Sequence, residues 1–90
     1  MQTNFLLGAL QITQDARMVL KRLPYDLVCR HAINEHGVIT AAERRRNERS
    51  MQTIGPVRSR YMVDPTDPKT RFVRIETDAQ WGETVISLED

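Results

Sequence analysis

Arginine is the residue type with the clearest chemical potential in this chain, and it is concentrated in the middle of the sequence. A guanidinium presents its donors in a planar fork that suits phosphate and carboxylate oxygens. Phosphate contacts in turn supply the sequence-independent part of nucleic-acid affinity. We therefore predict a nucleic-acid-binding surface built from the arginines of one basic run and of the segments that follow it, namely Arg44, Arg45, Arg46, Arg49, Arg58, Arg60 and Arg74.

The same run has a simpler interpretation, which is a solvated helix face. Glu43 and Glu48 stand among the arginines at spacings that give local ion pairs on a helix. Three consecutive arginines, however, cannot share one helix face, and further arginines follow in the alternating segments after residue 56. The sequence leaves both interpretations open.

The charge is uneven along the chain, although the formal net charge is only +1. All 13 Lys and Arg residues stand at or before Arg74. Such asymmetry indicates either an anionic partner for the basic part or an acidic end that folds back on it. The acidic residues that follow, with no basic residue among them, are Glu76, Asp78, Glu83, Glu89 and Asp90.

Cys29, His31 and His36 stand close together in the sequence and raise the question of a metal site. A structural zinc site needs four ligands at fixed spacing, whereas this pattern supplies at most three, on an unsuitable helical arc. We therefore predict no metal and structural roles for all three residues. Cys29 is expected to be a small core residue, and both histidines are expected to face solvent.

Motifs that would indicate an enzyme or a cofactor site are missing from the sequence. The four glycines are isolated, so there is no Gly-rich phosphate loop. No combination of Ser, His and an acid has a recognisable motif around the nucleophile. Asp64 and Asp67 flank Pro65, a pattern typical of a turn rather than of a paired acid and base. We expect neither catalysis nor a cofactor.

The length of 90 residues predicts one domain, residues 1–90, with a mainly aliphatic core because aromatics are only 6%. The longest apolar stretch, Phe5 to Ile12, is far shorter than a membrane span and lacks the basic start of a secretory signal. We expect no membrane partner, and a homodimer contact through Phe5–Ile12. The single cysteine, Cys29, fits a reducing compartment, so a cytoplasmic location is expected.

Capping residues and apolar periodicity predict three helices. Thr13 is a good N-cap for a first helix that Pro24 interrupts, and a second helix is expected over residues 24–36. A third should start at residue 41 behind a Thr40–Glu43 capping box and end before Gly55. The expected buried stripes are Ala16, Val19, Leu20 and Leu23 in the first helix, and Tyr25, Val28, Cys29 and Ala32, widened by Leu27 and Ile33, in the second.

After residue 56 the apolar period changes to two, which predicts an antiparallel hairpin over residues 57–77 and a third strand over residues 84–88. Phe72 falls on the arginine face, where it stacks on a base or fills a partner's pocket unless other elements cover it as core. Trp81 is expected to cap an edge of the core. Residues 3–12 fit a strand and a helix equally well. The apolar face should carry Val57, Tyr61, Val63, Val73 and Ile75, joined by Ile86 and Leu88.

The order of helix, helix, short apolar step, helix and hairpin over residues 13–77 resembles the winged-helix class of DNA-binding domains. Residues 50–54 look like the start of a recognition helix, with Ser50 as its cap. The resemblance implies DNA binding and a role in transcription regulation. The sequence departs from the pattern at Arg44, Arg45 and Glu48, where helix-turn-helix domains place apolar residues.

The predicted fold class is α+β, with two to three N-terminal helices followed by a small antiparallel sheet that consists of the hairpin and a third strand. The predicted function is a small regulatory nucleic-acid-binding module whose partner is duplex DNA. The alternative is a protein-binding adaptor or inhibitor, of the kind carried by mobile elements and phages, that acts through its charged surface.

Overall fold

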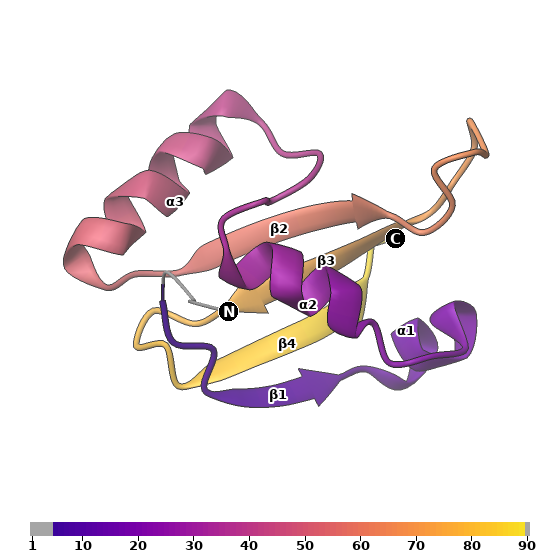
Figure 1. Cartoon of the computed structure of the whole chain (residues 1–90), viewed down its shortest axis with the longest axis horizontal. Helices are drawn as coiled ribbons and strands as arrows, with labels where there is room; N and C mark the ends of the chain where they lie inside the picture. Colours follow the sequence, from indigo (N-terminus) through magenta and orange to yellow (C-terminus); the bar gives the residue numbers. More distant parts are fainter. Residues whose placement is uncertain (1–4, 90) are drawn as a thin grey trace.

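The computed structural model describes residues 5–89 and contains three helices and four strands (Figure 1). None of these helices combines the length and hydropathy that a membrane span requires. The α+β class predicted from the sequence is confirmed. In chain order the elements are β1 (Ala9–Ile12), α1 (Gln14–Leu20), α2 (Tyr25–Ala32), α3 (Ala41–Thr53), β2 (Val57–Met62), β3 (Phe72–Thr77) and β4 (Glu83–Leu88).

The four strands form one mixed sheet in the order β1-β4-β3-β2. β2, β3 and β4 are antiparallel neighbours, as predicted for the hairpin and the third strand, whereas β1 lies parallel to β4. Residues 9–12 are therefore a strand, while residues 3 and 4 lie outside the described residues. The predicted order of helices followed by an antiparallel sheet is not confirmed, because β1 precedes every helix and pairs in parallel.

The winged-helix likeness is not confirmed either. α3 runs without a break through Ser50, which is thus an interior residue and not the cap of a separate recognition helix. The helix lies beside β2, at one edge of the sheet (Figure 1).

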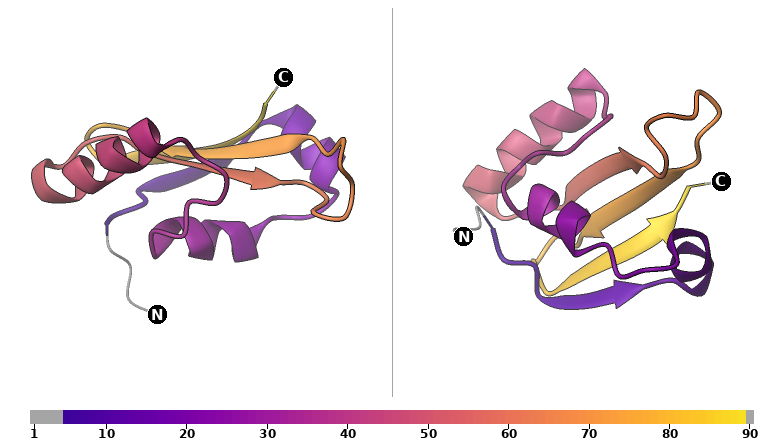
Figure 2. Two further views of the ribbon diagram at one scale, coloured as in Figure 1. Left: turned by 90° about the horizontal axis from the view of Figure 1, so that it is seen from above. Right: turned by 45° about the vertical axis from the view of Figure 1, so that its right-hand side comes forward.

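One face of the sheet is buried against α2, while α1 lies beyond the end of β1 and α3 runs alongside β2 (Figure 2). Side chains of β2, β3 and β4 alternate between this face and the opposite one, as the period of two predicted. Val63 lies beyond β2 and is only half-buried. The other apolar positions predicted for this face are confirmed as buried, namely Val57, Tyr61, Val73, Ile75, Ile86 and Leu88.

The helices bury somewhat different stripes from those predicted. Tyr25, expected in the core, is 63% exposed. In α1, Ala16 is buried, but the helix ends at Leu20 because Lys21 adopts a left-handed φ of 57°. Leu23 therefore leaves the stripe and is exposed. The residues that α2 turns inward are Leu27, Val28, His31 and Ala32.

β2 is an edge strand whose outward backbone groups are already bonded at Arg58 and Arg60. The Asn47 side chain accepts from the Arg58 N–H at 3.0 Å and donates to the Arg58 carbonyl at 2.8 Å. Further along, the Arg60 N–H donates to the His36 carbonyl at 2.9 Å, and the Arg60 carbonyl accepts a second bond from the same segment at 2.7 Å. The helix α3 and the segment that follows α2 therefore occupy the hydrogen-bonding groups that another strand would need in order to pair at Arg58 and Arg60.

Candidate functional site

α3 begins at the capping box that the sequence predicted. The Thr40 hydroxyl accepts from the Glu43 N–H at 3.1 Å, and the Glu43 carboxylate accepts from the Thr40 N–H at 3.2 Å. Two backbone N–H groups that a helix start leaves unpaired are thereby satisfied. The helix ends after Thr53, where Ile54 adopts a left-handed φ of 56°. The basic run is thus held in one helix of 13 residues.

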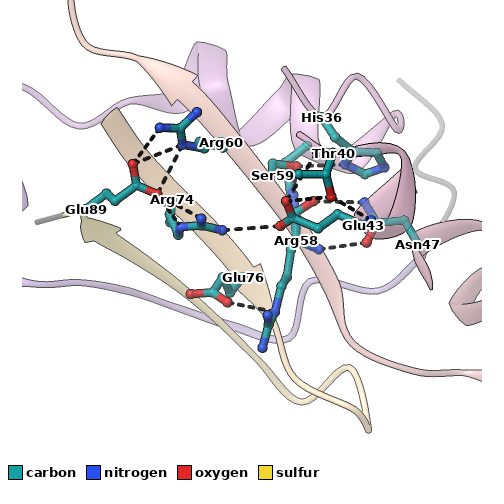
Figure 3. Close-up of polar contacts among 11 residues, drawn as sticks. His36, Thr40, Glu43, Asn47, Arg58, Ser59, Arg60, Arg74, Glu76 and Glu89 are labelled. Atoms are coloured by element: carbon teal, nitrogen blue, oxygen red, sulfur yellow. Dashed lines mark hydrogen bonds and ion pairs between the residues drawn. The ribbon is translucent and has the colours of Figure 1, made fainter. Parts of the chain in front are cut away.

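Polar side chains, rather than an apolar stripe, attach α3 to the sheet. Its buried residues are Asn47 and Ser50. The Asn47 side chain forms hydrogen bonds with both backbone groups of Arg58 at the edge of β2 (Figure 3), and the Ser50 hydroxyl donates to the Pro56 carbonyl at 2.6 Å. The sequence patterns described above do not predict this role. The signal available was an Asn and a Ser three residues apart, on a helix with almost no apolar stripe.

The four arginines of α3 surround the side of the helix that faces away from the sheet. At about 100° per residue, Arg45 and Arg49 point away from the side that carries Asn47, and Arg44 and Arg46 flank them. All four are exposed. Among residues 5–89, no acidic side chain forms an ion pair with any of them. We call these four residues the α3 arginine surface.

The three hairpin arginines lie on the sheet face opposite α2, where each is paired with a carboxylate (Figure 3). The Arg58 Nε lies 3.0 Å from a Glu76 oxygen. Arg60 and Arg74 share the Glu89 carboxylate, each with an N–O distance of 2.8 Å. Hydrogen bonds from Arg60 and then from Arg74 hold the pKa of Glu89 below its usual range.

The seven arginines of the predicted surface therefore fall into two groups, one unpaired within residues 5–89 and one neutralised. The groups adjoin, because Arg46 and Arg58 line the same cavity of about 80 Å³. Arg74 also reaches Glu43 of α3, at 3.4 Å. Of the two explanations for the charge asymmetry, the fold-back of the acidic end is realised at Glu89. Asp90 lies outside the described residues.

Phe72 lies on the arginine face, as the alternation predicted. The Arg60 guanidinium stacks over its ring, with 3.5 Å between the guanidinium carbon and the ring centroid. The Phe72 residue is half-buried, and the Arg60 guanidinium covers part of its ring.

Both histidines are buried, so the prediction that they face solvent is wrong. His31 has no exposed surface, and His36 is 8% exposed. The His31 Nδ1 lies 2.5 Å from the Ser59 hydroxyl, and its Nε2 lies 2.9 Å from the Thr77 hydroxyl. The His36 Nδ1 lies 2.7 Å from the same Ser59 oxygen. Hydroxyl groups of β2 and β3 therefore bond both ring nitrogens of His31 and the Nδ1 of His36, which offsets the cost of burying these polar atoms.

Burial also keeps both imidazoles neutral. It lowers the pKa of His31 to about 3, with a further contribution from His36. Burial and the nearby Arg44 guanidinium lower the pKa of His36 to about 4. Both rings are uncharged at neutral pH, and each therefore carries one ring proton.

The cluster of Cys29, His31 and His36 does not form a metal centre in the described part of the chain. No group of three or more His, Cys, Asp or Glu side chains within residues 5–89 is arranged to hold an ion. Both nitrogens of His31 are already bonded to hydroxyls. Cys29 is half-buried rather than a full core residue.

The N-terminal segment packs onto its own chain. Phe5 is buried, with its ring centroid 5.1 Å from that of His31 and 5.8 Å from that of Trp81. The Trp81 Nε1–H donates to the Gly55 carbonyl at 2.8 Å, so Trp81 covers one end of the core as predicted. The homodimer contact predicted for Phe5–Ile12 stays a prediction, and it cannot use the buried Phe5 ring.

The candidate site consists of the α3 arginine surface, the adjoining ion pairs of the hairpin, and the buried histidines behind them. Its chemistry is that of guanidinium donors with phosphate or carboxylate as the matching acceptor. Comparison of the chain with protein-family models, with curated proteins and with solved structures finds no match.

Proposed function

We propose that this protein is a small regulatory module that binds nucleic acid, with duplex DNA as the partner, through the α3 arginine surface. One observation carries the proposal: four exposed arginines surround one helix, and no carboxylate within residues 5–89 neutralises them. The same chain neutralises the arginines of its hairpin. A guanidinium group left unpaired on a rigid helix is available to phosphate oxygens.

The dimensions of α3 suit this role. Thirteen residues give a helix about 20 Å long, and the major groove of B-DNA, about 12 Å wide, admits an α-helix. The helix is attached at an edge of the sheet by only two buried side chains, Asn47 and Ser50, so most of its circumference faces outward. Arg45 and Arg49 would contact phosphates, because they point furthest from the sheet.

The salt dependence of DNA binding tests the proposal. Each phosphate contact contributes about 0.9 to the slope of log affinity against log salt on duplex DNA. The double variant Arg45→Ala/Arg49→Ala should therefore flatten the slope by one to two units, measured by fluorescence anisotropy with a short labelled duplex between ~50 and ~200 mM salt. Stability should change little, since both side chains are exposed.

A matched control removes two exposed arginines from the opposite end of the sheet. Arg17 and Arg71 are exposed, and neither belongs to α3 or to its ion pairs. The variant Arg17→Ala/Arg71→Ala has the same change in net charge, so it should leave the slope close to that of the wild-type protein. If the wild-type protein retains no DNA or RNA at ~50 mM salt, nucleic-acid binding is not its function.

The second candidate function is protein binding by an adaptor or inhibitor, and the sheet face opposite α2 favours it. That face carries paired arginines and glutamates together with Met62, which is 39% exposed, and the half-buried Phe72. Protein interfaces are enriched in aromatic residues, Met and Arg, and they surround an apolar centre with a polar rim. Met62→Glu should then abolish binding to the protein partner while leaving the salt slope on DNA unchanged, and an unchanged affinity for that partner would exclude this face.

A further inference from the structure

The hydrogen-bond chain between α2 and the sheet has a fixed direction, which is set by a backbone carbonyl at one end. The Leu7 carbonyl only accepts, so the Thr84 hydroxyl donates to it, at 2.6 Å. Thr84 has a single hydroxyl proton, and it therefore accepts from the Thr77 hydroxyl, at 2.7 Å. Thr77 has then also used its proton, so it accepts from the Nε2–H of His31, at 2.9 Å.

The direction continues through Ser59 to the second histidine. Neutral His31 carries its one ring proton on Nε2, so its Nδ1 accepts from the Ser59 hydroxyl. Ser59 has then donated its only proton, and it accepts from the Nδ1–H of His36. The ring proton of His36 is thus fixed on the inward nitrogen, and its Nε2 carries a lone pair.

His36 also lines a small cavity beside α3, and we infer that its Nε2 faces this cavity. The His36 Nε2 has no hydrogen-bond partner within residues 5–89, and no buried polar side-chain atom there is left unsatisfied, so this nitrogen is accessible. The cavity has a volume of about 130 Å³. Its lining residues are Asn34, His36, Arg44, Asn47, Glu48 and Met51.

The groups around this cavity specify the ligand. The His36 Nε2 and the Glu48 carboxylate accept hydrogen bonds, whereas the Arg44 guanidinium donates them, and Met51 offers an apolar surface. A matching ligand carries a donor for His36 or Glu48 and an acceptor for Arg44, and it has no net charge to balance because Arg44 and Glu48 offset each other. A cavity of this volume holds about one six-membered ring. Arg44 also belongs to the α3 arginine surface, where the proposed function places a phosphate backbone.

We propose that the His36 cavity binds a single pyrimidine base of a nucleic acid held on the α3 arginine surface. The inference rests on the proposed function and adds a base-reading pocket to it. Cytosine fits best, because its N4 amino group would donate to the His36 lone pair or to Glu48 while its ring acceptors face Arg44. This edge is the one used in base pairing, so the base must be unpaired, in a single strand or splayed out of a duplex.

Titration with mononucleotides tests the pocket without requiring the α3 surface to bind a strand. We expect cytidine monophosphate to shift the ¹⁵N resonance of the His36 Nε2 in a saturable manner, with a smaller response to adenosine monophosphate because a purine has two rings. No shift with cytidine monophosphate at millimolar concentration would overturn the proposal. An equal response to ribose 5-phosphate would identify an anion site instead, and an equal response to acetamide would identify a site for a carboxamide of a protein partner.

Because His36 is buried and bonded to Ser59, its substitution could unfold the protein. The test therefore uses variants at exposed positions of α3. Glu48→Ala removes one exposed acceptor and should weaken the binding of cytidine monophosphate about tenfold. Gln52→Ala, at another exposed position of α3 outside the cavity, should leave it unchanged. Equal affinities of the Glu48→Ala variant and the wild-type protein would overturn the role of Glu48 as an acceptor, and an unchanged His36 resonance in the same titration would overturn the base-reading role of the cavity.

A further comparison separates this inference from the proposed function. Oligo(dC) should bind more tightly than oligo(dA) at every salt concentration, whereas the Arg45→Ala/Arg49→Ala variant should weaken both and flatten the salt slope without changing the preference for oligo(dC). Equal affinities for the two oligonucleotides with a normal slope would overturn the pocket alone. Loss of all strand binding, with the mononucleotide response intact, would overturn the proposed function alone.

Discussion

His31 and His36 lie where an imidazole must stay neutral. Both nitrogens of His31 are engaged by hydroxyls, and its Nδ1 can accept from Ser59 only while it carries no proton. Protonation of Nδ1 would break this bond and place a charge among apolar side chains, which costs several kcal/mol without a counter-charge. His36 differs, because a proton on its accessible Nε2 would leave the bond to Ser59 intact.

The low pKa values of both histidines predict that the folded protein loses stability in acid. The folded pKa values of about 3 and about 4 lie below the value of about 6.5 expected in the unfolded chain. The unfolded chain therefore binds up to two more protons below pH ~6.5, and the free energy of unfolding should fall by up to about 2.7 kcal/mol per pH unit down to pH ~4. Urea unfolding followed at a series of pH values measures the slope.

His36→Gln provides the control, since it removes one of the two protonation sites and should halve the slope. A free energy of unfolding that stays constant between pH ~6.5 and ~5 would show that the histidines are protonated in the folded protein.

α3 shows how a helix without an apolar stripe is held in place. Its hydrophobic contribution is small, and the Asn47 amide replaces the strand that β2 lacks on its outer side by bonding both backbone groups of Arg58. The arginines can occupy the outward side of the helix because attachment does not depend on them. The position of the α3 arginine surface is thus set by one amide and one hydroxyl, those of Asn47 and Ser50.

Asn47→Ala should accordingly lower the free energy of unfolding by about 2–3 kcal/mol, because it leaves a backbone donor and acceptor of β2 without partners. Gln52→Ala, exposed on the same helix, should change it by less than about 0.5 kcal/mol. Chemical denaturation of both variants measures the difference. A similar small effect of both would mean that water replaces the Asn47 amide at this edge.

Local patterns predicted the elements that local physics determines. The capping box at Thr40 and the alternation along β2 and β3 were predictable, because each depends on residues close in sequence. β1 was not, since its partner β4 lies more than seventy residues away and a strand of four residues carries little periodic signal. Burial of His31 was missed for the same reason: its hydroxyl partners come from distant strands.

The paired charges connect the end of the chain to its middle. Glu89 follows the last strand, yet its carboxylate bridges Arg60 and Arg74 on two other strands, and Arg74 continues the network to Glu43 of α3. The carboxylates that keep the net charge of the protein small therefore include these two, which pair with the arginines of the hairpin. The four arginines of α3 stay outside this network and are exposed.

Glu89→Gln should release the Arg60 guanidinium and leave Arg74 with only its ion pair to Glu43. Binding to DNA should tighten at low salt, and the salt slope should steepen by about 0.9 for each of the two arginines that contacts phosphate. Glu83→Gln removes the same charge from β4 without breaking a described ion pair, and serves as the control. Equal slopes for the two variants would mean that the hairpin arginines stay away from the bound DNA.

The two borders of the sheet are unequal. Along β2 the outward backbone groups at Arg58 and Arg60 are bonded within the chain. Along β1, Ala9 and Thr13 bond toward β4, so Leu10 and Ile12 direct their backbone groups outward, and no described residue meets them. Two copies that paired through β1 about a two-fold axis would leave only their β2 edges to a third copy, and there the backbone groups of Arg58 and Arg60 are already bonded. Association by strand pairing would therefore stop at a pair rather than propagate into a filament.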